Sequence, residues 1–248
     1  MRFAVAFVIA VLTVSSGVPQ SAQPPAGFVS LFNGRDLTGW KVPEGDNGHW
    51  KVVDGVIDYD ARSESKGDRH LWTTRAYRDF VLRVDWRFKD TPFIYRNGRI
   101  LLPNGTEKLD INGKPIAISF PDSDSGILVR GGPQVNLWCW PSGSGELWSV
   151  RRNVKLSPEV RAAATPKVHA DRNIGEWNTM EITMKGNRIW IVLNSIPVIE
   201  NALFDAVPEE GPIGLQHHGE WKDGQWAGPP SLIQFRNIFI KAGADSGR

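Results

Sequence analysis

The feature that most limits the fold of this chain is an alternation of apolar and polar side chains with a period of two. In the segment 80–88, FVLRVDWRF, large apolar residues recur at every second position and charged residues fall between them. Such alternation between glycine, proline and asparagine breaks is typical of strands with one buried face. Only SPEVRAAATP offers a helix, with Ser157 able to cap it and Pro158 at its first position. We therefore predict an all-β fold, a two-sheet antiparallel jelly-roll sandwich with one short helix at most.

The N-terminal residues 1–22 have the composition of a secretory signal peptide. A basic Arg2 precedes an apolar run from Phe3 to Val14, and small residues follow, with cleavage expected between Gly17 and Ala22. The run is about a dozen residues long, whereas a membrane span needs roughly 20. We expect an exported protein, periplasmic or secreted, and the single Cys139 rules out a disulfide within the chain.

The remaining sequence is long enough for one large sandwich domain, which we place at residues 27–241. Residues 89–120 differ from the rest, because three Asn-Gly turn pairs occur there with little alternation between them. We predict a ribbon inserted between two sandwich strands, of the kind that forms a rim or lid beside a site. With 29 basic and 27 acidic side chains and no basic run, neither nucleic acid nor an anionic membrane is an expected partner.

The stretch 122–148 concentrates polar and aromatic residues on what we predict to be three short strands. Strand side chains alternate between faces, so Gln134, Asn136, Trp138 and Trp140 share one face. That face is polar at one end and aromatic at the other. It is suited to a flat, hydroxylated ligand such as a sugar ring, with the amides bonding hydroxyl groups.

Eleven tryptophans in 248 residues suggest that several indoles serve as a binding surface. We expect Trp138, Trp148 and Trp140 to stack on sugar faces, with burial in the sandwich as the alternative for each. Cys139 points to the opposite side of its strand and is expected to be a small buried apolar residue rather than a nucleophile.

Seven stretches of the chain follow one another in the order GFVSLFNGRDLTGW, WKVVDGVI, LWTTRAYRDFVLRVDWRF, DSGILVRG, GEWNTMEITMKGNRIWIVLN, GPIGLQHHG and IQFRNIFIK. Together, in this order, they resemble the 3-keto-disaccharide hydrolase domain family, and the resemblance covers residues 27–241. The family is known for the concanavalin A-like lectin/glucanase jelly roll, so the resemblance implies a concave sheet that faces carbohydrate.

Two segments depart from the family pattern. The insertion 89–120 is longer than the family core needs, and EWKDGQWAGPPS, residues 220–231, widens the gap before the last strand. Both would lie near the rim of a cleft, so they bear on the size of the substrate.

The resemblance implies cleavage of a glycoside that already carries a ketone at ring carbon 3. The ketone acidifies the hydrogen on carbon 2, a base removes it, the enolate expels the glycosidic oxygen from carbon 1, and water adds to the enone. Such a site needs a base of moderate pKa, a group that stabilises the enolate oxygen, and an acid or metal at the leaving oxygen.

His218 is our first candidate for the base, since a histidine titrates near neutral pH. In LQHHG, Gln216 and His218 fall on one face, opposite Leu215 and His217, so one histidine should face the cleft and Gln216 could bond a hydroxyl group. A histidine bonded to structural backbone is the alternative. The histidines in turns or polar segments are weaker candidates: His49, His70 and His169.

Arg130 ends its strand and could polarise the ketone, with a structural ion pair as the equal alternative. Asp124, Glu146 and Asp85 are candidates for the acid or for metal ligands, although the charged face around Asp85 could simply be solvated. A divalent ion held by His218 and two of these carboxylates would stabilise an enolate, but the spacing does not demand a metal or any other cofactor.

Two other functions fit the same fold. A non-catalytic, lectin-like carbohydrate-binding module would need the aromatic surface but not the histidine and its charged neighbours. A conventional retaining glucanase would need two carboxylates about 5 to 5.5 Å apart, and the E-x-D-x-x-E run typical of such enzymes is missing from this sequence.

Overall fold

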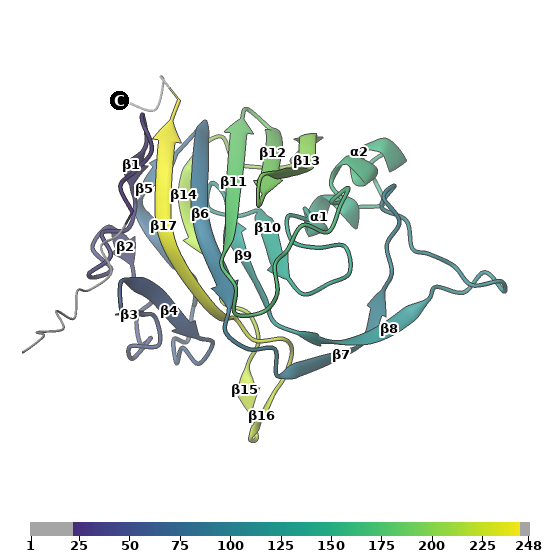
Figure 1. Ribbon diagram of the computed structural model, residues 1–248, viewed down its shortest axis with the longest axis horizontal. Coiled ribbons are helices and arrows are strands. Elements are labelled where there is room, and N and C mark those ends of the chain that lie inside the picture. Colours follow the sequence, from purple (N-terminus) through teal and green to yellow (C-terminus); the bar gives the residue numbers. More distant parts are fainter. Residues whose placement is uncertain (1–21, 244–248) are drawn as a thin grey trace, which may run out of the picture.

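A computed structural model describes residues 22–243, and the predicted signal peptide lies outside this range apart from its last residue. Two antiparallel sheets pack face to face (Figure 1). The larger sheet contains, in spatial order, β13 (Ile196–Leu203), β12 (Arg188–Leu193), β11 (Asn178–Lys185), β6 (Phe80–Phe88), β17 (Leu232–Ala242), β4 (Val56–Asp60) and β3 (Lys51–Val53), with β1 (Val29–Ser30) paired to β17. The smaller sheet contains β10 (Gln134–Trp138), β9 (Asp124–Leu128), β14 (Gly211–Leu215), β5 (Leu71–Tyr77) and β2 (Trp40–Lys41). The predicted all-β sandwich is confirmed.

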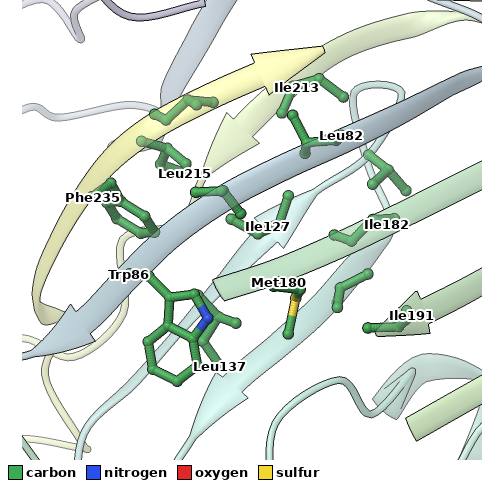
Figure 2. Packing of buried hydrophobic residues seen from close by; sticks show 14 of the residues in the cluster. Leu82, Trp86, Ile127, Leu137, Met180, Ile182, Ile191, Ile213, Leu215 and Phe235 are labelled. Carbon is green, nitrogen blue, oxygen red and sulfur yellow. The ribbon is translucent and has the colours of Figure 1, made fainter. Parts of the chain in front are cut away.

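The hydrophobic core fills the space between the two sheets, as Figure 2 shows. In β6 the predicted alternation holds, because every second side chain from Phe80 to Phe88 is at most 3% exposed. Ile127, Leu137 and Leu215 meet them from the smaller sheet. Burying a large apolar side chain contributes about 1.5–3 kcal/mol, so these facing rows fix which side of each sheet is turned outward.

The hairpin turns follow the dipeptides that the sequence provides. Asp54 and Gly55 join β3 to β4 with φ of 49° and 77°. Positive φ at both central residues defines the mirror-image turn that suits the right-handed twist of paired strands. Asn194 and Ser195, with φ of 52° and 69°, repeat this arrangement between β12 and β13.

Two short helices are present in the described residues, where at most one was predicted. The predicted helix is α2 (Pro158–Ala163), in which the Ser157 hydroxyl accepts a hydrogen bond from the Val160 backbone at 3.4 Å. The additional helix α1 (Trp148–Arg151) replaces the last of the three predicted strands. Gly143 and Gly145 adopt φ of 80° and 105°, which a strand does not accommodate, so the chain turns away from the sheet before α1 begins.

Two antiparallel ribbons project from the sandwich and belong to neither large sheet. One pairs β7 (Phe93–Arg99) with β8 (Ala117–Asp122), and the other pairs β15 (Trp221–Lys222) with β16 (Gln225–Trp226). Only Ser123 separates β8 from β9, so the first ribbon leads directly into the smaller sheet. None of the helices within residues 22–243 has the length and apolar character needed to cross a membrane.

Candidate functional site

The outer face of the smaller sheet carries the side chains that alternate with its core residues. Gln134 of β10 and Gln216, just after β14, meet there: Nε2 of Gln216 donates to Oε1 of Gln134 at 2.8 Å. Gln134 lies over Gly126, where a Cβ atom would approach its Cγ to 2.6 Å. The structure thus brings these two predicted hydroxyl-binding amides together, and they bond each other.

His218 lies at the end of this face, with its ring orientation fixed by the backbone. Its Nδ1 atom is 2.7 Å from the carbonyl oxygen of Pro229, and its own backbone N–H donates to Oγ of Ser231. A carbonyl oxygen can only accept, so Nδ1 carries the hydrogen and the neutral ring has its lone pair on Nε2. The side chain is 38% exposed, which leaves Nε2 accessible as a base.

Two carboxyl groups lie beside this histidine. Oδ2 of Asp124 is 4.0 Å from Nε2 of His218, and Asp122 lies two residues earlier with its side chain fully buried. Oδ1 of Asp122 accepts a hydrogen bond from the Cys139 backbone at 3.1 Å, while Oδ2 of Asp122 and Oδ1 of Asp124 have no donor. A negative charge on these buried oxygens, without a donor to stabilise it, costs free energy, so the protonated form of each carboxyl group is favoured.

The proton affinity of the pair follows from that burial. Burial, and then the charge of Asp124, raise the pKa of Asp122 to about 7. Burial also raises the pKa of Asp124 well above its usual range. Two buried carboxyl groups so close together cannot both ionise cheaply, so the pair retains a proton at neutral pH. A base and a proton donor therefore stand side by side.

His70 contributes a neutral hydrogen-bond donor near the same place. Its Nδ1 atom accepts the backbone N–H of His217 at 3.0 Å, so the ring hydrogen is on Nε2. Burial lowers the pKa of His70, which keeps the ring uncharged. Its Nε2 atom is 3.9 Å from Oδ1 of Asp68, too far for a hydrogen bond, so this N–H can reach a ligand.

A cleft of about 880 Å³ opens beside His70. Trp72 lines it and lies flat on Gly214, where a Cβ atom would come within 2.6 Å of the indole. The indole N–H donates to Oδ2 of Asp68 at 2.6 Å, which holds the ring in place. An indole fixed on a sheet beside charged groups such as Arg69 is the kind of surface on which a sugar ring stacks.

Arg130 does not join this group. Its guanidinium pairs with Asp79 at 2.8 Å and donates to the backbone carbonyls of Arg78, Gly186 and Pro208. Arg130 follows β9 at the end opposite Asp124, six residues away, which is about 20 Å along an extended chain. The structural ion pair, our alternative for this residue, matches the geometry, and the predicted contact with the ketone does not.

Glu146 and Asp85 are also held elsewhere. Glu146 is fully buried and pairs with Nε of Arg151 at 2.5 Å. Asp85 lies on β6 in the other sheet, where it accepts hydrogen bonds from Thr179 and Asn237, both at 2.7 Å. Neither carboxylate lies beside His218. Glu146 belongs to the loop before α1, which turns away from the sheet, and Asp85 is separated from His218 by the core of the sandwich.

The predicted aromatic surface of β10 is mostly covered. Trp138 is 4% exposed, donates to the Gly143 carbonyl at 2.7 Å and stacks on Trp140 at 4.8 Å. Asn136 is 3% exposed, so its amide does not face an open cleft. Trp148 is exposed on α1, where Arg152 covers its ring at 5.2 Å.

Cys139 packs against the hydrophobic core, as predicted from its place on the strand. Burial raises the pKa of its thiol to about 12, so the thiolate is not formed at neutral pH. Within residues 22–243, no three side chains of histidine, cysteine, aspartate or glutamate have the arrangement of a metal site.

The sequence analysis missed Asp122 and Trp72 as site residues and ranked His70 only as a weaker candidate, although a signal for each was present. Asp122 stands two positions before Asp124, and His70 two positions before Trp72. A spacing of two puts strand residues on one face, so each pair could have been proposed as a unit. What the spacing did not reveal is that β5 and β14 lie side by side.

Comparison with known proteins places these observations in a family. The model of the 3-keto-alpha-glucoside-1,2-lyase-like domain matches residues 27–241. A search of curated proteins gave no match. Two similar solved structures are both named a putative glycosyl hydrolase from Parabacteroides distasonis ATCC 8503. The first is 20% identical over 88% of this chain and 85% of that chain, with a TM-score of 0.55.

The second is 19% identical over 88% of this chain and 94% of that chain, with a TM-score of 0.51. The carbohydrate-binding module CBM66 from Bacillus subtilis is 16% identical over 82% of this chain and 96% of that chain, with a TM-score of 0.42. At such identities the two hydrolase structures establish the sandwich fold alone. The family model covers nearly every described residue, and the resemblance seen in the sequence is confirmed: the chain belongs to the 3-keto-alpha-glucoside-1,2-lyase-like domain family.

Proposed function

We propose that this protein cleaves 3-keto-glycosides by elimination between ring carbons 1 and 2, followed by addition of water. The observation that carries the proposal is the placement of His218, whose Nε2 lies 4.0 Å from Oδ2 of Asp124, a carboxyl group whose pKa burial raises well above its usual range. Membership in the family supports a carbohydrate substrate. The open cleft beside His70 and Trp72 supplies room for the oxidised ring.

The first step removes the hydrogen on carbon 2. The oxidised ring stacks on Trp72, with carbon 2 facing His218. Nε2 of His218 takes the proton, and the electron pair of the C–H bond forms an enolate with the ketone. The Nε2–H of neutral His70 donates to the enolate oxygen, as a fixed donor aimed at developing charge does in other enzymes.

The second step breaks the glycosidic bond. The enolate electrons form the double bond between carbons 1 and 2, the carbon 3 ketone returns, and the bond from carbon 1 to the leaving oxygen breaks. Asp124 gives its proton to that oxygen. The imidazolium of His218 then returns a proton to Asp124, so both groups regain their starting states. Water adds across the enone, with its hydroxyl on carbon 1 and its proton on carbon 2.

The test compares methyl 3-keto-glucoside and 3-keto-trehalose with their unoxidised parents. We expect release of reducing sugar from the 3-keto compounds alone, with solvent deuterium entering carbon 2 when the reaction runs in heavy water. Equal cleavage of unoxidised sugars would overturn the proposed chemistry. Binding of the 3-keto compounds without any turnover would instead support the lectin-like alternative.

A further inference from the structure

The two ribbons outside the sandwich face each other across a groove of about 610 Å³. One wall comes from β7 and the other from the β15–β16 ribbon, which project at the same end of the sandwich (Figure 1). Both ribbons lie largely within the segments 89–120 and 220–231, which we predicted from the sequence to depart from the family pattern and to lie near the rim of a cleft.

The first wall of the groove, β7, is paired with β8, the strand that carries Asp122. Phe93, in the first wall, is the strand partner of Asp122. The Tyr95 ring meets the Trp140 ring edge to face, with 5.0 Å between the ring centroids, and the backbone N–H of the neighbouring Cys139 donates to Asp122. Trp221, in the second wall, comes three residues after His218. A group attached to the leaving oxygen at this site would thus extend into the groove.

The walls of the groove are mainly apolar and aromatic. Ile94 is 44% exposed and Trp221 is 42% exposed, and both line this shared space. The guanidinium of Arg62 lies 4.4 Å over the Trp221 ring, and Trp226 meets that ring edge to face at 5.0 Å and 72°. Both indoles are held in place before any ligand arrives.

The chemistry of the lining separates two kinds of ligand. A second sugar ring would need hydrogen-bonding partners for several hydroxyl groups, and among the described lining residues the only side chains with more than one polar atom are Arg96, Asn97 and Gln225. A planar aromatic ring needs few such partners and gains from stacked and edge contacts with fixed indoles.

We propose that this groove binds an aromatic leaving group, so that the protein prefers 3-keto-glycosides whose anomeric oxygen carries an aryl ring. The inference rests on the proposed function, since the groove is placed relative to His218 and Asp122. The elimination then releases a phenol, and the phenol oxygen takes the proton of Asp124 that the oxygen of an alkyl leaving group takes in the general mechanism.

The test measures the ratio of kcat/KM for 4-nitrophenyl 3-keto-α-glucoside to that for methyl 3-keto-α-glucoside. Trp221→Ala should lower the ratio about tenfold, the value of one lost aromatic contact. Ile94→Ser alters the opposite wall of the groove and should also lower the kcat/KM ratio. Trp177→Ala is the matched control, because the Trp177 indole packs against Arg87 and Arg236 outside the groove, and it should leave the ratio as in the parent.

Binding of unoxidised 4-nitrophenyl α-glucoside, measured by calorimetry, separates the two proposals. If the 3-keto compounds are not turned over but Trp221→Ala still weakens this binding, the proposed function fails and the groove proposal stands. If the parent turns over both substrates and Trp221→Ala changes neither the ratio nor the binding, the groove proposal is overturned. A higher affinity for a disaccharide than for the aryl glucoside, lost in the same variants, would overturn it in favour of a second sugar.

Discussion

His218 and Asp124 are 94 residues apart in sequence, yet Nε2 of one lies 4.0 Å from Oδ2 of the other. A single hydroxyl group fixes this approach. Oγ of Ser231 accepts the backbone N–H of His218 at 2.7 Å and donates to the backbone carbonyl of Asp124 at 2.7 Å. Ser231 thereby ties the end of β14 to the start of β9. The proposed base and acid are held by these backbone contacts, which leaves both side chains free for the proton exchange that the proposal requires.

The role of His218 predicts a large kinetic loss with a specific rescue. His218→Ala should lower kcat on a 3-keto-glucoside by about 100- to 10,000-fold, the usual contribution of a general base. Added imidazole should restore part of the rate, because the pocket would then hold a mobile base. His169→Gln is the control, since the His169 side chain is exposed and its Nδ1 atom lies 3.3 Å from the carbonyl oxygen of Pro141, away from His218. Full activity of His218→Ala would refute the assignment of the base.

The role of Asp124 as acid can be separated from that of the base. Asp124→Asn keeps the shape of the side chain but removes its acidic proton. We expect a fall of about 100-fold in release of methanol from methyl 3-keto-glucoside, and a smaller fall for a 4-nitrophenyl leaving group, which needs less proton assistance. Exchange of the carbon 2 hydrogen with heavy water should continue. If exchange slowed as much as bond cleavage, Asp124 would be acting through the base instead.

Asp122 predicts a dependence of stability on pH. Its pKa is raised from 3.8 to about 7, so between these values the folded protein binds a proton that the unfolded chain has released. The free energy of unfolding should therefore decrease as pH rises from about 4 to 7, by at most about 4 kcal/mol from this group.

Asp122→Asn removes this titration and should make the protein more stable than the parent at pH 8, with a flatter profile from pH 4 to 8. Urea denaturation at several pH values measures the effect. Asp223→Asn, at an exposed turn, should follow the parent profile. If Asp122→Asn kept the slope of the parent, the raised pKa would not be a property of the folded state.

The sequence was sufficient for the sandwich because the period of two is local. Each apolar row, such as that of β6, needs only its own strand to show which face is buried. The same rule placed Gln134 and Gln216 on outer faces, although it could not show that their strands flank β9 and that they bond each other. Strand order comes from long-range pairing, which no local pattern encodes.

The site was harder to predict because it depends on position along a strand as well as on face. Asp124 begins β9 and Arg130 follows its other end, where a left-handed backbone breaks the alternation of faces. The contacts of Arg130 with Asp79 and Gly186 show that this end has a structural role, and no local pattern predicts them. Glu146 was misplaced for a different reason. Left-handed glycines redirected the chain after β10, so a residue expected on a strand became part of a buried ion pair.

Arg130 should matter for stability and not for the chemical step. Arg130→Met removes the bonds to Asp79 and to three carbonyl oxygens, and should lower the free energy of unfolding by about 3 kcal/mol. The kcat of the folded fraction should stay near that of the parent. The neighbouring pair of Arg78 with Glu209 is exposed on both sides, so Arg78→Ala should cost less than about 1 kcal/mol. A loss of kcat in Arg130→Met without a loss of stability would restore its catalytic assignment.

Trp72 should affect binding more than chemistry, because in the proposed function it contacts the sugar ring away from the reacting bonds. Trp72→Ala removes the indole that lies on Gly214 and should raise KM by about 10-fold while kcat changes less. Gly214→Ala tests the same contact from the side of the sheet. Its new methyl group would lie 2.6 Å from the indole of Trp72, too close for contact, so the indole would have to move away from the sheet. Both variants should therefore raise KM in the same direction. If Trp72→Ala lowered kcat and left KM unchanged, the indole would be positioning His70, whose ring it meets at 5.8 Å, and the sugar would stack elsewhere.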